Sequence, residues 1–90
     1  MQITDVKISL REKDERLRAF ATVTLDDCFV IRGLRIISGA SKLFVAMPAR
    51  LKSDGTYQDI AHPIHVEARQ MFEQVVLAEY FRVSGDAAGA

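Results

Sequence analysis

LFVAMP (residues 43–48) and DIAHPI (residues 59–64) are the two most informative stretches of this chain. The first is an apolar run that predicts a buried strand, and Pro48 must end this strand because a proline has no amide hydrogen to donate. The second predicts an extended segment that leads into a helix, since Pro63 disfavours a helical conformation at His62 and fits the first turn of a helix. We therefore expect a sheet followed by a helix.

Upstream of LFVAMP, apolar and polar residues alternate with period two, which is typical of half-buried strands. The alternation covers residues 6–10 and 17–25, and a third segment, residues 29–36, changes phase at Gly33. A glycine at such a change of phase predicts a β-bulge that redirects its neighbours, here Arg32 and Arg35. Together with residues 43–47 and 57–60, these segments predict an antiparallel sheet of about five strands.

From Ile64 onward the apolar period changes to 3.6, which predicts one long C-terminal amphipathic helix. Its apolar face is expected to hold Ile64, Ala68, Met71, Phe72, Val75 and Ala78. Either His62 or His65 could cap its start. The sheet and the helix make an α+β domain over residues 1–83, and residues 84–90 are expected to form a disordered tail.

The end of this predicted helix is apolar on nearly every side. Val76, Leu77, Tyr80 and Phe81 all fall outside the main apolar stripe. One sheet would not cover every side of such a turn, and a domain of 90 residues buries a comparatively small share of its surface. We therefore expect a homodimer whose interface contains Leu77, Tyr80 and Phe81.

The charge of the chain is balanced overall but unevenly distributed. A formal net charge of zero argues against the strongly basic surface of a general nucleic-acid binder. Residues 28–53 nevertheless contain no Asp or Glu, and their basic residues are Arg32, Arg35, Lys42, Arg50 and Lys52. Such side chains pair with phosphate oxygens, and arginine can also read a guanine edge. The same residues would equally suit an ordinary solvated surface, so charge alone leaves both interpretations open.

The residue types that carry catalysis or bind metals are scarce. Cys28 lies in an apolar run and is expected to be a buried structural thiol. His62, His65 and Asp59, with Cys28 far away in sequence, fall short of the three or four ligands of a zinc site. No phosphate-binding loop or nucleophile motif is present in the sequence. We expect no catalytic residue, metal, cofactor or small-molecule substrate.

The sequence also argues against a membrane protein. No apolar run approaches the roughly 18 to 20 residues that span a bilayer. The N-terminal residues MQITD lack the basic and apolar regions of a signal peptide. We expect a soluble cytoplasmic protein without membrane contact.

The two motifs resemble those of the SpoVG family, the small bacterial septation and sporulation regulators. The resemblance extends over ITDV at residues 3–6, LD at 25–26, RII at 35–37 and EY at 79–80, and thus over most of the chain. Family members are described as nucleic-acid-binding regulators, so the resemblance implies regulation rather than catalysis. In the family the stretch after the LFVAMP-type motif is rich in Lys and Arg and is associated with nucleic-acid contact, which points to Arg50 and Lys52. Leu51 departs from the family's more continuous basic run.

The sequence and the resemblance together predict a cytoplasmic homodimer that binds DNA, or alternatively RNA, and regulates septation, cell division or transcription. The alternative is a protein-interaction module of the division or transcription machinery that acts through its C-terminal helix. The neutral net charge favours this alternative, and so does the predicted helix, whose stretch up to Tyr80 carries Glu67, Glu73 and Glu79 against Arg69 alone. The salt dependence of nucleic-acid affinity would distinguish the two functions, because phosphate binding weakens strongly as the salt concentration rises.

Overall fold

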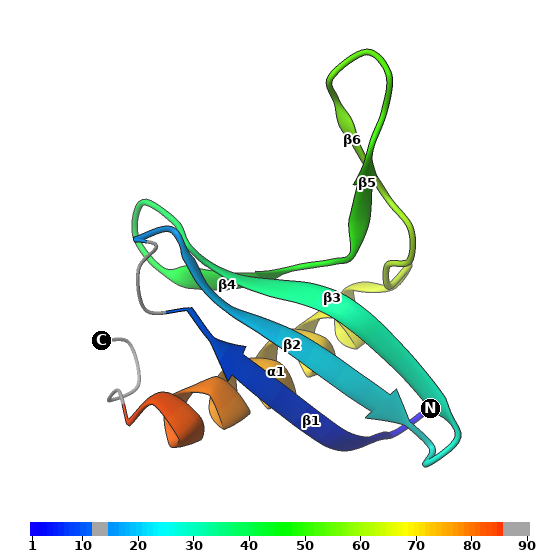
Figure 1. Ribbon diagram of the computed structural model, residues 1–90. Helices are drawn as coiled ribbons and strands as arrows, with labels where there is room; N and C mark the ends of the chain where they lie inside the picture. Colours follow the sequence, from blue (N-terminus) through cyan, green and yellow to red (C-terminus); the bar gives the residue numbers. More distant parts are fainter. Residues whose placement is uncertain (12–14, 86–90) are drawn as a thin grey trace.

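The chain folds as an α+β domain, as expected from the sequence. The computed structural model describes residues 1–11 and 15–85, so residues 12–14 and residues 86–90 of the expected tail lie outside the described residues. The elements are β1 (Ile3–Leu10), β2 (Leu17–Leu25), β3 (Phe29–Ser38), β4 (Leu43–Ala46), β5 (Ala49–Leu51), β6 (Tyr57–Asp59) and α1 (Val66–Ser84). Strands β1 to β4 form an antiparallel sheet in sequence order, and β5 pairs with β6 in a separate sheet (Figure 1).

The LFVAMP motif forms β4 and the turn away from the main sheet. The strand ends at Ala46, and Pro48 begins a change of direction. The carbonyl oxygen of Pro48 accepts a hydrogen bond of 2.7 Å from the amide of Ile60, so the chain leaves and returns at the same point. The expectation that residues 57–60 add a fifth strand to the main sheet is wrong, because these residues pair with the unpredicted strand β5 instead.

The hydrophobic core lies between α1 and one face of the four-stranded sheet. The helix crosses behind the sheet in Figure 1 and buries Phe72, Val76 and Tyr80 against it. The buried sheet residues are Ala19, Ala21, Val23, Leu25, Leu34, Ile36 and Val45, joined by Met47 after β4. Burial of one large aliphatic or aromatic side chain stabilises a fold by about 1.5 to 3 kcal/mol, so this layer dominates the stability of the domain.

The buried face of α1 differs from the predicted apolar stripe. Phe72 was predicted correctly, but Ile64 is 81% exposed, Val75 is 37% exposed and Ala78 is also exposed. The reason is that the helix carries apolar residues on more than one side, so periodicity alone does not select the face that the sheet covers. In the described part of the chain, no helix combines the length and apolar character needed to cross a membrane.

The two ends of α1 are formed in different ways. His65 occupies the N-cap position, as one of the two expected alternatives, but its side chain makes no capping hydrogen bond. Pro63 precedes the helix rather than lying in its first turn, so it keeps the chain extended where it enters the helix. At the other end, Gly85 adopts a left-handed conformation with φ of 76°, and its amide donates a hydrogen bond to the carbonyl oxygen of Phe81.

The predicted bulge at Gly33 is confirmed. Ala21 pairs with Leu34 and Val23 pairs with Ile31, so one residue of β2 stands opposite two residues of β3. Gly33 has φ of +83°, a conformation that a side chain makes unfavourable. The extra residue restores the alternation, so Ile31 packs against the same core as Leu34.

Cys28 is exposed, and the expectation of a buried thiol is wrong. It follows Asp26 and Asp27, both of which have positive φ values, in the turn between β2 and β3. The amide of Cys28 donates to the carbonyl oxygen of Leu25, which closes this turn. The apolar run therefore begins outside the sheet, and its next residue, Phe29, is 62% exposed.

Candidate nucleic-acid interface

Arg50 and Lys52 lie on a hairpin that projects from the body of the molecule. We call this hairpin, residues 49–59, the arm; it consists of β5, a turn and β6 (Figure 1). The amide of Lys52 donates to the carbonyl oxygen of Thr56 at 2.7 Å, which continues the pairing beyond the strands. Both basic side chains are exposed. The arm thus presents to solvent the two residues that the family resemblance selects.

The tip of the arm is ordered by a compact set of hydrogen bonds. Thr56 donates from its amide at 3.0 Å and from its hydroxyl at 2.6 Å to the same oxygen of Asp54. These bonds favour the charged carboxylate and lower the pKa of Asp54. Gly55, with φ of +89°, donates its amide to the carbonyl oxygen of Lys52 and completes the turn.

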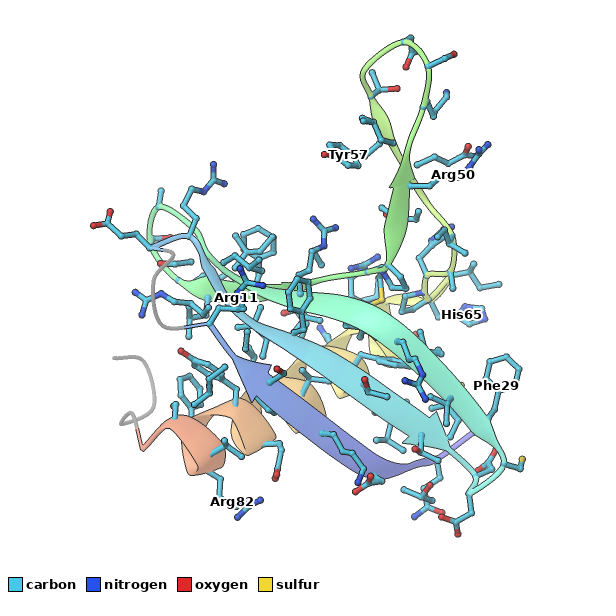
Figure 2. The ribbon with its side chains drawn as sticks, in the orientation of Figure 1. Arg11, Phe29, Arg50, Tyr57, His65 and Arg82 are labelled. Atoms are coloured by element: carbon cyan, nitrogen blue, oxygen red, sulfur yellow. The ribbon has the colours of Figure 1, made fainter. Side chains whose placement is uncertain are left out.

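The two faces of the arm differ in character. Arg50 is paired with Gln58, whereas Leu51 is paired with Tyr57. Directly paired residues share a face, and successive residues alternate, so these two pairs lie on opposite sides. Figure 2 shows the Arg50 and Tyr57 side chains pointing away from the arm in opposite directions. One face is therefore polar and basic, and the other is apolar.

Arg35 and Arg32 have different surroundings although they are close in sequence: Arg32 lies within the bulge and Arg35 two residues after it. Arg35 is half-buried, and its Nη2 donates a hydrogen bond of 3.1 Å to the carbonyl oxygen of Met47. This contact joins β3 to the segment that leads into the arm. Arg32 is exposed within the bulge. Arg35 thus has a structural role in addition to any contact with nucleic acid.

Lys42 lies apart from the arm, in the turn before β4. Five residues separate it from Pro48, and an extended chain of that length spans about 17 to 20 Å. Lys42 lines a shallow pocket of about 470 Å³ together with Arg18, Leu77 and Phe81. The structure therefore does not gather the five predicted basic residues into one cluster.

The residues predicted for a dimer interface at the end of α1 are largely covered by the chain itself. Tyr80 is only 3% exposed and Val76 is fully buried against the sheet. Leu77 and Phe81 are half-buried and pack against the same core. Val76 and Tyr80 are buried because they follow the i, i+4 spacing of the face that meets the sheet, whereas Leu77 and Phe81 stay partly exposed, so a dimer interface at this helix end remains a prediction.

The sheet face opposite α1 holds two residues that sequence reasoning did not assign to the site. Phe20 stands directly opposite Arg35, so both side chains lie on this face. The guanidinium carbon of Arg11 lies 5.5 Å from the centre of the Phe20 ring, within the range of a cation–π contact. The sequence signal that could have pointed to this face is the period-two pattern, which puts Phe20 among the polar positions of its strand.

The two histidines are both exposed where the chain approaches α1. Within residues 1–11 and 15–85, no three His, Cys, Asp or Glu residues lie close enough together to hold a metal ion. The chemically distinctive groups of the described chain are therefore the basic residues of the arm and of the open sheet face.

The four-stranded sheet covered by one helix defines a small α+β protein, and the two-faced hairpin arm is its projecting surface. The chain belongs to the SpoVG family, whose profile matches residues 1–82. A protein of Myxococcus xanthus is 52% identical over 82 residues, which cover 91% of this chain and 82% of that protein. A protein of Anaeromyxobacter sp. is 50% identical over 82 residues, covering 91% of this chain and 84% of its own length. Both are named "Putative septation protein SpoVG". "Putative septation protein SpoVG 2" of Listeria monocytogenes is 49% identical over 90 residues, which cover all of this chain and 88% of that protein.

Proposed function

We propose that this protein is a homodimeric regulator that binds DNA, or alternatively RNA, and that it takes part in septation. The septation role is supported by the names of its relatives. The observation that carries nucleic-acid binding is the basic face of the arm, where Arg50 and Lys52 are exposed on a projecting hairpin. A bacterial nucleic-acid target implies that the protein acts in the cytoplasm, by occupying a regulatory site.

The electrostatics of the arm support phosphate as the ligand. Within the described part of the chain, neither Arg50 nor Lys52 takes part in an ion pair, whereas Arg82 is paired with Glu79. Binding of a phosphate therefore displaces no carboxylate from these side chains. Each phosphate contact releases counterions, which favours binding at low salt.

In a dimer, two small basic faces together are sufficient to bind one nucleic acid. Two copies of Arg50 and Lys52 offer four contacts on one nucleic acid, and the second face binds at a high effective concentration once the first is bound. Arg11 and Phe20 on the open sheet face offer a further cation and a ring on which an unpaired base could stack.

The experiment is a salt titration of binding to a DNA duplex and to a single strand of RNA. If Arg50 and Lys52 contact phosphates in both copies, changing both to Ala lowers the slope of log affinity against log salt by about 0.9 per lost contact on duplex DNA. Lys42→Ala, at the other end of β4, is the comparison: it lowers the slope only if the nucleic acid also reaches this turn. An unchanged affinity and slope in a folded Arg50/Lys52 double variant would refute the proposal.

The second candidate is a protein-interaction module that uses α1. Val75 and Val83 on the helix are 37% and 40% exposed, and Glu67 lies in its first turn. A helix with exposed apolar residues and acidic neighbours suits a protein partner better than a phosphate backbone. A partner captured by the native protein and lost on changing Val75 and Val83 to Ser, with no measurable nucleic-acid affinity, would favour this candidate.

A further inference from the structure

The apolar face of the arm is not covered by any of the residues that the structure describes. Leu51 is 60% exposed and its cross-strand neighbour Tyr57 is 70% exposed. The strands of the arm have three residues each and, among residues 1–11 and 15–85, pair only with each other. An isolated two-stranded hairpin is marginally stable at best in water, so an exposed apolar face on such a hairpin is a surface that packing would stabilise.

A second uncovered apolar surface follows directly after the arm. Ile60, Ile64 and Val66 are 67%, 81% and 68% exposed. Ile64 and Val66 also line a shallow hollow of about 420 Å³ at the start of α1. The two surfaces lie in one continuous stretch of chain, yet each leaves its large side chains exposed, so they do not cover each other within one molecule.

We infer that the apolar face of the arm packs into the hollow at the start of α1 of a second copy, and that this exchange of arms forms the dimer. The inference rests on the homodimer proposed above and names its interface. In a twofold dimer each contact occurs twice, so one pair of complementary surfaces on a single chain covers both arms.

The exposed area is large enough for such an interface. Leu51, Tyr57, Ile60, Ile64 and Val66 each expose roughly 100 Å² of apolar surface. Two copies then contribute about 1,000 Å² before any polar rim is included, and specific interfaces begin at about 1,200 Å². The polar rim supplies the remaining area of about 200 Å², and a single copy of each surface would contribute only half as much apolar area, which favours a second copy over a small unrelated partner.

The charges at the edges of the two surfaces are complementary. Asp59 is paired with Ala49, on the same face of the arm as Leu51, and lies at its base. The hollow holds Arg69 together with Glu73. An arm seated there with its Leu51 face inward brings the Asp59 carboxylate to the side of α1 that carries Arg69.

This interface leaves the basic face free. Arg50 and Gln58 lie on the side of the arm that points away from Tyr57, as Figure 2 shows for Arg50 and Tyr57. Packing of Tyr57 against a second copy therefore turns Arg50 outward. The arm would thus separate two tasks, dimer formation on one face and phosphate contact on the other.

The test is the oligomeric state of the full chain with a glutamate on either face. Tyr57→Glu and Leu51→Glu place a charge on the apolar face, and we expect each to raise the dissociation constant of the dimer at least 100-fold in sedimentation equilibrium. Gln58→Glu is the matched control, since it adds the same charge one residue away on the opposite face, and it should remain dimeric. Val83→Glu tests the end of α1 at an exposed position.

The outcomes separate this inference from the proposed function. Monomeric Tyr57→Glu and Leu51→Glu variants with native circular dichroism support the inference. If both variants stay dimeric, or if Val83→Glu alone produces monomers, the arm is not the interface, while a dimeric nucleic-acid-binding protein still stands. If the native chain is itself monomeric at micromolar concentration, the proposed homodimer fails as well.

Discussion

Arg35 Nη2 donates a hydrogen bond to the carbonyl oxygen of Met47, and this bond ties the centre of the sheet to the base of the arm. Arg35 comes from β3, next to the bulge, whereas Met47 follows β4 and immediately precedes Pro48. The position of the basic arm residues therefore depends on an arginine that lies outside the arm.

The first prediction concerns this bond. Arg35→Ala removes a charged donor from a half-buried carbonyl oxygen, and bonds of this kind contribute about 1.5 to 3 kcal/mol to the free energy of unfolding. We expect a loss in the lower part of this range in urea denaturation. Arg32→Ala, at an exposed position, should change the free energy of unfolding by less than about 0.5 kcal/mol. Equal losses for the two variants would contradict this role for Arg35.

The second prediction concerns the bulge. Gly33→Ala forces a side chain into a left-handed conformation, which costs roughly 1 to 2 kcal/mol. An added Cβ would lie 3.6 Å from the Cβ of Pro48, an ordinary contact, so the backbone rather than a clash is the expected cause. Gly55→Ala, with φ of +89° and nothing within 4 Å, isolates the backbone cost at the arm tip. If thermal denaturation shows Gly33→Ala to be neutral, the bulge does not need glycine.

The third prediction is a pH dependence of the arm tip. Hydrogen bonds from Thr56 lower the pKa of Asp54 below its ordinary value of 3.8. Because the folded pKa is depressed, the stabilisation is present above pH 3.8 and is lost as the pH falls through the lower folded value. The amide resonance of Thr56 should therefore titrate below pH 3.8 in NMR spectra. In Asp54→Asn this titration should disappear; its persistence would assign it to another group.

The fourth prediction concerns the single cysteine. Because Cys28 is exposed in a turn, a thiol reagent should modify it in the folded protein nearly as fast as in urea. Cys28→Ser should change the free energy of unfolding by less than about 0.5 kcal/mol. Leu34→Ala, at a fully buried position of β3, should cost about 2 to 5 kcal/mol by comparison. A thiol that reacts only after unfolding would show that the turn is closed in solution.

The sequence predicts the strands and the helix of this fold better than it predicts which of their residues are buried. The period-two segments, the stop at Pro48 and the change of phase at Gly33 are local signals, and they correspond to observed strands, a strand end and a bulge, respectively. The buried face of α1 was not predictable in the same way, because Val75 and Val76 are adjacent and equally apolar. Only the position of the sheet decides that Val76 is buried while Val75 is not.

For the candidate site, the sequence likewise predicts the residues but not where the fold places them. Arg50 and Lys52 were selected by the resemblance, but their placement on an arm depends on β5, which at three residues is too short to carry a pattern of its own. The contact of Arg11, which directly follows β1, with Phe20 of β2 has no signature within either segment of the sequence. The exposure of Tyr57 and Ile64 likewise depends on tertiary structure, which local periodicity does not encode.

The pairing of Leu51 with Tyr57 makes the number of residues in the arm turn as important as their identity. A slip of one residue between β5 and β6 would carry Tyr57 to the side of Arg50, because side chains alternate along a strand. Insertions of one residue between Ser53 and Gly55 should therefore mix the two surfaces, whereas insertions of two would preserve them. Relatives of this protein are thus expected to vary the length of this turn in even steps.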